Sequence, residues 1–436
     1  MSEKNQNAQN RSKPSQKKKT SSATVVLNRF LGVLLALVIV AVTGVVVYAL
    51  RIGVDVPSHT SGTVVTDPNA PPTEAFVPTT TTEEETEPEE DPVERLALDH
   101  LAEMTLDEKL AQLILTSPDS LTDSYYRTYA GDRAAERLEQ YPVAGLVFES
   151  GNVSDAEQVK QTVSEWQSYS KLPLFIGAAE EGGAESLLSG VGLTTPTESM
   201  LTYGTAGDTD AVRVLGKTMG EELYAAGFNL DLAPVADVTS EANAGTALAE
   251  RSFGASPLTV SKMAAAMVRG LQEGGEIACL KHFPGVGSMQ EGYYSDTLSR
   301  TLDELRENDW LPFKNGIAAG AGMVMVSHVS MPELLGSEVP CDLSETVVTE
   351  YLRGELGYDG VVVTEDLDSI PNAYSANASV QALLAGCDLI YTTDSVGDTL
   401  AALQQAVADG TLTEERVNES VYRILLLKCR FGIVTE

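Results

Sequence analysis

Sulfur, histidine and positive charge are scarce in this chain of 436 residues. It has four cysteines and four histidines, and 29 Lys and Arg residues stand against 63 Asp and Glu residues. The cysteines form no CxxC pair, which disfavours a zinc site or a dense disulfide framework but leaves one or two long-range disulfides open. Cys279 and Cys387 lie in apolar runs and are expected to be small buried side chains.

Several common functional motifs are also missing. No GxGxxG opens a helix after a strand and no GxxxxGK[ST] occurs, so nucleotide binding lacks support. GxSxG, HExxH and EF-hand patterns are absent as well. The formal net charge of −34 would repel phosphates, so we expect no nucleic-acid partner. We therefore predict no cofactor and no metal ion.

The charge is distributed unevenly, and a basic N-terminal segment followed by an apolar run predicts a membrane anchor. Residues 1–29 carry seven basic residues and one acidic residue, and residues 30–50 form an uncharged apolar run of 21 residues. As a helix this run would span ~31 Å, enough for a hydrocarbon core of ~30 Å. The positive-inside rule then keeps the basic tail in the cytoplasm and exports the remainder. The alternative is a cleaved signal peptide, although the run exceeds the usual apolar core of ~7–15 residues.

Residues 51–92 are predicted to form a stalk. The segment 52–92 holds seven prolines, a run of four threonines and ten acidic residues, without Lys or Arg. Such a composition buries too little apolar surface to offset the entropy of ordering it, so an extended, disordered segment is expected.

From residue 93 to 436, short apolar runs alternate with amphipathic stretches such as 211–227 and 399–410. Near-continuous apolar strands between such helices indicate a buried parallel sheet of βαβ units. Seven strands over ~340 residues favour an α/β fold with a closed TIM-type (β/α)8-like barrel. The expected strands are 144–148, 173–178, 228–236, 277–283, 322–329, 360–365 and 388–393.

Polar side chains gather where these strands end. They are Glu180, Glu181, Asp237, Lys281, His282, His328, Glu365 and Asp366. In a β/α barrel, the chemistry lies at the carboxyl ends of the strands. Each residue alone could be a rim side chain with satisfied hydrogen bonds, but their convergence on one rim favours a site.

Seven stretches along this segment carry a family resemblance. They are EEGG (180–183), NLDLAPVADV (229–238), ERSFG (250–254), KHFPG (281–285), MVSHV (325–329), ELGYDGVVVTEDL (355–367) and AGCDLI (385–390). Residues 95–433 thereby resemble the N-terminal barrel domain of glycoside hydrolase family 3, in its β-N-acetylhexosaminidase branch. The resemblance implies a barrel that acts on N-acetylglucosamine-containing glycans.

The resemblance also assigns site residues. The nucleophile position, an Asp in the family, is Glu365 here, and the family's acid/base His falls on Tyr294. The sugar-contacting positions Arg251, Lys281 and His282 are kept, with Asp237 nearby.

Four departures bear on turnover. Glu365 is one methylene longer than Asp, and a shift of ~1 Å can cost on the order of 10²-fold in rate. Tyr294 has a reference pKa of ~10, which suits acid/base catalysis poorly. Gly292 and Ala179 replace two family Asp residues, one from the acid/base dyad and one that grips sugar hydroxyls. Asp296 could supply the acid if its loop folds differently.

The sequence thus predicts a membrane-anchored, extracytoplasmic glycosidase of the β-N-acetylhexosaminidase type, with a wall glycan as its carbohydrate partner. Two alternatives remain. One is a catalytically impaired sugar-binding pseudoenzyme, and the other is a scaffold whose rim binds another protein. The retained Arg251, Lys281 and His282 favour the carbohydrate functions, whereas the lost dyad favours the pseudoenzyme.

Overall fold

Parallel strands form one eight-stranded sheet in the order β7-β6-β5-β4-β3-β2-β1-β8. The computed structural model describes residues 91–240, 245–289, 297–370 and 377–435. The strands are β1 Ile114–Thr116, β2 Gly145–Val147, β3 Phe175–Ala178, β4 Leu230–Asp231, β5 Ile277–Phe283, β6 Met323–Val326, β7 Val361–Thr364 and β8 Ile390–Tyr391. The Thr364 N–H donates to the Leu389 carbonyl at 3.1 Å, which joins β7 to the start of β8. The sheet therefore closes into a barrel.

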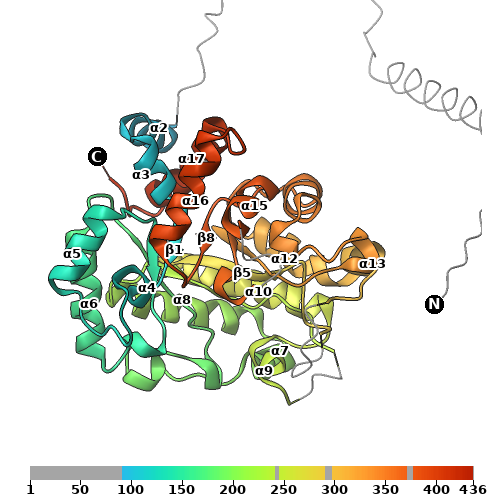
Figure 1. Cartoon of the computed structure of the whole chain (residues 1–436). Coiled ribbons are helices and arrows are strands. Elements are labelled where there is room, and N and C mark those ends of the chain that lie inside the picture. Colours follow the sequence, from blue (N-terminus) through green and yellow to red (C-terminus); the bar gives the residue numbers. More distant parts are fainter. Residues whose placement is uncertain (1–90, 241–244, 290–296, 371–376, 436) are drawn as a thin grey trace, which may run out of the picture. The chain divides into compact units, whose positions relative to one another are not determined.

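Helices surround this sheet, and Figure 1 shows α5 and α6 on the side opposite α12 and α13. The longer helices are α2 Pro92–Glu103, α5 Gly131–Gln140, α6 Ala156–Tyr169, α8 Thr209–Ala225, α10 Pro257–Glu273, α12 Trp310–Ala318, α15 Ala378–Ala385, α16 Val396–Ala408 and α17 Glu414–Arg430. Shorter ones are α3 Leu106–Ala111, α4 Pro118–Thr122, α7 Met200–Ala206, α9 Ala247–Arg251, α11 Leu302–Glu304 and α13 Pro332–Leu335. A π-helical segment, η7, covers Thr346–Glu355.

Local sequence explains where these helices begin and how closely they pack. The Asp208 side chain accepts hydrogen bonds from the first N–H groups of α8, and Ser256 caps α10 in the same way. Helices α8 and α10 pack against each other. A β-carbon at Gly270 would lie 2.3 Å from the Arg213 carbonyl oxygen, so the close crossing requires glycine there.

The TIM-type barrel prediction is confirmed, with corrections to two strands. The structure adds β1, an eighth strand that the sequence reading missed. The run LILT is short and directly follows α3, so it resembles the end of that helix. The expected strand 228–236 is reduced to β4, because Pro234 has no N–H for the ladder. Val235 still forms an isolated bridge to Lys281.

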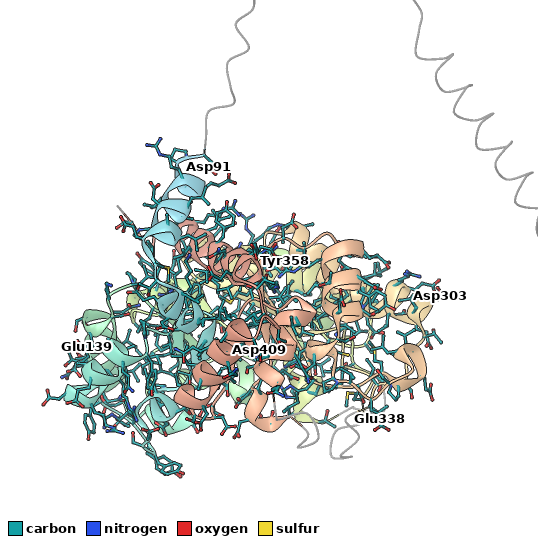
Figure 2. All side chains as sticks on the ribbon, turned by 45° about the horizontal axis from the view of Figure 1, so that its top comes forward. Asp91, Glu139, Asp303, Glu338, Tyr358 and Asp409 are labelled. Carbon is teal, nitrogen blue, oxygen red and sulfur yellow. The ribbon has the colours of Figure 1, made fainter. Side chains whose placement is uncertain are left out.

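All four cysteines are buried and free, so the long-range disulfides that the spacing left open are absent. Acidic side chains are spread around the periphery. Asp91, Glu139, Asp303, Glu338 and Asp409 point outward from different elements in Figure 2.

The predicted tail (1–29), membrane helix (30–50) and nearly all of the stalk (51–92) lie outside the described residues. Helix α2 begins at Pro92 with Asp91 as its N-cap, one residue before the expected domain start. Within the described ranges, no helix is both long and apolar enough to cross a bilayer.

Candidate active site

Six polar residues lie at the carboxyl end of the barrel, each in or just after a strand. Glu181 follows β3, Asp237 follows β4, Lys281 and His282 belong to the end of β5, His328 follows β6 and Glu365 follows β7. Because parallel strands expose their carboxyl ends on one rim, the fold brings these side chains to the same face. Segments 241–244, 290–296 and 371–376, in the connections after β4, β5 and β7, lie outside the described residues.

Glu181 binds two cations in a nearly dry environment. Its carboxylate lies 2.6 Å from the Lys281 Nζ and accepts from the Arg251 Nη2 at 2.8 Å. The Glu181 and Lys281 side chains are only 5% and 6% exposed, whereas Arg251 is 26% exposed. Burial alone would raise the pKa of Glu181, but the charges of Lys281 and Arg251 hold that pKa at about 2. The three side chains form one network of ion pairs.

The neighbouring carboxylate, Glu180, is directed away from this network. It accepts from the Ser186 hydroxyl and from the Leu188 N–H at 2.9 Å. Burial raises the pKa of Glu180. Of the two adjacent glutamates that the sequence singled out, only Glu181 therefore joins the candidate site.

His282 is oriented by Asp237. The His282 Nδ1 lies 2.7 Å from the Asp237 Oδ2, and the Val286 N–H donates to Oδ1 of the same carboxylate at 2.7 Å. A proton on Nδ1 satisfies this contact, and the Nε2 then faces Glu365, whose Oε1 is 4.0 Å away. Asp237 thus acts through His282 and also holds the start of the loop after β5.

Glu365 lies between two histidines. Its Oε2 accepts from the His328 backbone N–H at 2.9 Å and lies 3.7 Å from the His328 Nε2, while Oε1 faces His282. Burial works to raise the pKa of Glu365, but the charges of His282 and then His328 lower that pKa below its usual value. The side chain remains 25% exposed. The site therefore presents an ionised carboxylate that a substrate can reach.

His328 has a partner that the sequence reading did not identify. Its Nδ1 lies 3.3 Å from the Oδ2 of Asp342, and its Nε2 lies 2.8 Å from the Ser369 hydroxyl. Burial lowers the pKa of His328, but the hydrogen bond to Asp342 and the charge of Glu365 outweigh it and raise that pKa overall. Asp342, in the short helix η6 Cys341–Leu343, has a fully buried side chain. Its partnership with His328 has no local sequence signal.

Asp366, next to the candidate nucleophile, has a structural role. Its carboxylate accepts from the Thr393 hydroxyl at 2.6 Å and from the Thr393 N–H at 2.9 Å. This arrangement holds the end of β7 against the end of β8. It also leaves Glu365, rather than Asp366, directed toward the histidines.

A further buried acid lies below the β5 loop. Asp309 ends the π-helical turn η5 Leu305–Asp309, and a β-carbon at Gly285 would lie 2.7 Å from the Asp309 Cβ. Burial raises the pKa of Asp309 to about 7, against the lowering effect of Arg300 at 3.2 Å. This carboxyl packs against the loop that follows Lys281 and His282.

Tyr294 and Asp296, the expected acid/base position and its substitute, lie outside the described residues. Their assignments stay predictions. Across the described ranges, no cluster of three His, Cys, Asp or Glu side chains is arranged to hold a metal ion.

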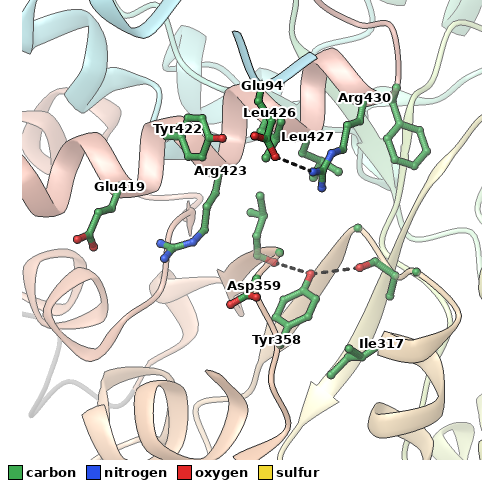
Figure 3. Close-up of a pocket in the computed structure, with 16 residues that line it drawn as sticks. Glu94, Ile317, Tyr358, Asp359, Glu419, Tyr422, Arg423, Leu426, Leu427 and Arg430 are labelled. Atoms are coloured by element: carbon green, nitrogen blue, oxygen red, sulfur yellow. Dashed lines mark hydrogen bonds and ion pairs between the residues drawn. The ribbon is translucent and has the colours of Figure 1, made fainter. Parts of the chain in front are cut away.

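In the described part of the chain, two hollows lie away from the rim residues. One of about 650 Å³ lies between α17 and the starting ends of β6 and β7 (Figure 3). The Tyr358 hydroxyl donates there toward the carbonyls of Ala321 and Val361, and Arg430 faces Glu94. The hollow is at the end of the barrel opposite Glu365.

Known proteins share this barrel. A 31% identical β-N-acetylglucosaminidase of glycoside hydrolase family 3 from Paenibacillus superposes with a TM-score of 0.68, over 76% of this chain and 64% of that one. A β-N-acetylhexosaminidase from Beutenbergia cavernae, 26% identical, has a TM-score of 0.66 over 74% of this chain and 98% of that one. β-Hexosaminidase A of Pseudoalteromonas piscicida is 30% identical over 68% of this chain.

The chain spans 55% of the Pseudoalteromonas protein's length. A β-hexosaminidase of Stenotrophomonas maltophilia is 34% identical over 61% of this chain and 82% of its own. Residues 105–427 match the model of the glycosyl hydrolase family 3 N-terminal domain. The chain belongs to glycoside hydrolase family 3.

Proposed function

We propose that this protein hydrolyses terminal β-linked N-acetylglucosamine from glycans, with Glu365 as nucleophile. The observation that carries the proposal is the ionised, partly exposed Glu365 carboxylate between His282 and His328 at the carboxyl rim. The names of several family relatives, β-hexosaminidase and β-N-acetylglucosaminidase, support the substrate class.

The proposed reaction is a double displacement. A Glu365 oxygen attacks the anomeric carbon while the bond to the leaving oxygen breaks, and water then hydrolyses the glycosyl ester. His282 and His328 keep the attacking carboxylate ionised before the reaction. Lys281 and Arg251 are fixed by Glu181, so their remaining N–H groups are oriented donors for sugar hydroxyls or an acetamido carbonyl. Tyr294 or Asp296 is the proposed source of the proton for the leaving group.

An aryl β-N-acetylglucosaminide tests the role of Glu365, because its leaving group needs little protonation. We expect slow turnover and a glycosyl-enzyme adduct visible by mass spectrometry in the full-length protein. The adduct should vanish in Glu365→Gln and persist in Glu338→Gln, a matched change at an exposed position. Absence of the adduct from the unaltered protein would contradict the proposal and favour the sugar-binding pseudoenzyme.

We further propose that residues 30–50 anchor the protein with the barrel outside the cytoplasm. The support is the basic segment 1–29 before the apolar run and the acidic segment 51–92 after it. Protease added to intact cells should then remove the barrel domain. A barrel that stays protected until the cells are lysed would contradict this topology.

A further inference from the structure

Exposed tyrosines cluster on one loop of the barrel. In the described part of the chain, exposed large aromatic side chains occur at five positions, and three of them fall within residues 125–129. Tyr125 is 90% exposed, Tyr126 is 78% exposed and Tyr129 is 60% exposed. Isolated exposed aromatics are ordinary, but a contiguous group on one surface indicates a binding function.

The backbone of this tyrosine loop (residues 123–130) is held in place by one carboxylate. Asp119, in α4, accepts hydrogen bonds from the Tyr126 N–H at 2.7 Å and the Arg127 N–H at 2.8 Å. The same carboxylate accepts from the Asn152 side chain at 2.7 Å, and Asn152 also donates to the Arg127 carbonyl. Asn152 is buried, so the loop is attached to the neighbouring connection after β2.

Two of the three rings, those of Tyr126 and Tyr129, have neighbours that position them. Tyr126 adopts a left-handed conformation with φ of 55°, and its Cδ1 would lie 3.1 Å from a β-carbon at Gly151. The guanidinium carbon of Arg127 lies 4.2 Å from the centre of the Tyr129 ring, and Arg127 itself is buried. An uncommon backbone conformation that holds an apolar ring in water costs stability, which points to a use for that ring.

The tyrosine loop lies on the same rim as Glu365. It follows β1, so it emerges at the carboxyl end of the barrel. The Ser120 hydroxyl of α4 donates to the Thr393 carbonyl at 2.6 Å, and Thr393 in turn binds Asp366, the residue after Glu365. A chain of direct hydrogen bonds therefore connects α4 to the end of β7.

We propose that Tyr125, Tyr126 and Tyr129 bind further sugar units of a glycan chain whose terminal unit occupies the Glu365 site. This inference rests on the proposed function, because the glycan is the substrate class proposed there. A pyranose presents apolar C–H faces and polar edges, and tyrosine offers an apolar ring with a hydroxyl tip. The loop is a sugar-stacking surface on the approach to the site.

The observations favour a glycan over a protein partner. Protein-binding surfaces usually surround their aromatic anchors with a desolvated apolar centre, whereas Tyr125 and Tyr126 stand almost entirely in water. Separate rings above a rigid backbone suit successive flat sugar units. Their place on the catalytic rim suits a substrate that extends beyond the cleaved residue.

The test compares a β-1,4-linked N-acetylglucosamine hexasaccharide with the monosaccharide, by calorimetry on the full-length protein. The Glu365→Gln background prevents cleavage during the measurement. Tyr125→Ala combined with Tyr126→Asn removes two rings, and Asn tolerates the left-handed conformation at position 126. We expect at least a tenfold loss of affinity for the hexasaccharide and less than a twofold change for the monosaccharide.

Two controls separate loss of binding from loss of structure. Tyr224→Ala removes a 62% exposed tyrosine from α8 and should leave hexasaccharide affinity unchanged. Tyr125→Phe keeps the ring and should retain affinity within about threefold. Equal hexasaccharide affinity with and without the two rings would overturn the proposal, and so would a hexasaccharide that binds no better than the monosaccharide.

Failure of the proposed function gives a different result. In that case the aryl monosaccharide forms no Glu365 adduct, while the hexasaccharide still loses affinity when the tyrosines are replaced. The variant with Tyr125→Ala and Tyr126→Asn could instead keep its affinity for the hexasaccharide and fail to bind an envelope protein that the unaltered protein binds. The surface would then be a protein-binding surface, and the glycan proposal would be wrong.

Discussion

His328 and Glu365 contact each other through both backbone and side chain. The His328 N–H donates to the Glu365 Oε2 at 2.9 Å, and the imidazole Nε2 lies 3.7 Å from the same oxygen. The backbone contact fixes the position of the carboxylate, whereas the imidazole contact depends on protonation. Asp342, on the far side of the ring, favours the protonated form.

Asp342→Asn should narrow the pH range of activity. Without the Asp342 charge, burial is less opposed and the pKa of His328 falls. The basic limb of the kcat/KM profile should therefore shift to lower pH. An NMR titration of the imidazole measures the same shift in a protein with little turnover.

The stability linked to His328 has the opposite pH dependence from that of a paired acid. Its folded-state pKa is raised, so the contribution to stability is complete below ~6.5 and is lost as pH rises through the folded-state pKa.

The control for the activity profile is Asp359→Asn, a matched change at an exposed position, which should alter neither limb of the kcat/KM profile. A profile in Asp342→Asn identical to that of the unaltered protein would contradict the proposed pairing.

Restoring the family's reacting groups should increase turnover. Glu365→Asp shortens the nucleophile, and Gly292→Asp with Tyr294→His rebuilds the acid/base dyad. The triple variant should hydrolyse an aryl β-N-acetylglucosaminide at least tenfold faster than the unaltered protein, because the shorter carboxylate corrects a misplacement of ~1 Å that can cost on the order of 10²-fold in rate. Strong turnover in the unaltered protein that Asp296→Asn abolishes would instead identify Asp296 as the acid.

Lys281→Met should destabilise the barrel. The change leaves a Glu181 carboxylate that is 5% exposed with Arg251 as its remaining cation, and breaking such a buried pair costs about 3 kcal/mol. Urea denaturation at pH 7 measures the difference in the free energy of unfolding. Lys171→Met removes an 85% exposed lysine paired with Glu108 and should change stability little. Equal losses in both variants would argue against a special role for the buried pair.

Asp309→Asn should reduce the loss of stability as the pH rises from ~4 to ~7. The pKa of Asp309 is about 7 in the folded protein, above the ordinary value of 3.8, so the folded state binds the proton more tightly. Its contribution is complete below ~4 and is lost as pH rises through ~7. Between pH 5 and 8, the stability of the unaltered protein should fall relative to the variant, by on the order of 1 kcal/mol or more. Asp303→Asn, at an 89% exposed side chain, should show no such trend.

Much of the rim could be predicted because its residues follow strands with strong apolar patterns. Strand β5 matches the expected range 277–283, so Lys281 and His282 were correctly placed at its end. The choice between Glu180 and Glu181 could not be predicted, because adjacent residues of one type differ only in the direction that the backbone gives them. Only the folded chain shows that Glu180 bonds to the following loop.

Contacts between distant segments were also beyond prediction. Asp342 reaches His328 from a short helix in the connection after β6, and no spacing rule relates the two. The bond from Ser120 to Thr393 spans 273 residues and exists because β1 and β8 are neighbours in the closed barrel. Because β1 was not predicted, the hydrogen bond from Ser120 to Thr393 could not be predicted either.

Because its four cysteines are buried, the folded protein should react slowly with thiol reagents. Thiolates, not thiols, react with alkylating agents and oxidants. Burial raises the pKa of Cys279 to about 12 and also raises those of Cys341, Cys387 and Cys429. An oxidising compartment should therefore neither crosslink nor modify the native barrel. The rate of thiol labelling therefore measures how fast the barrel opens, and this measurement needs no activity assay.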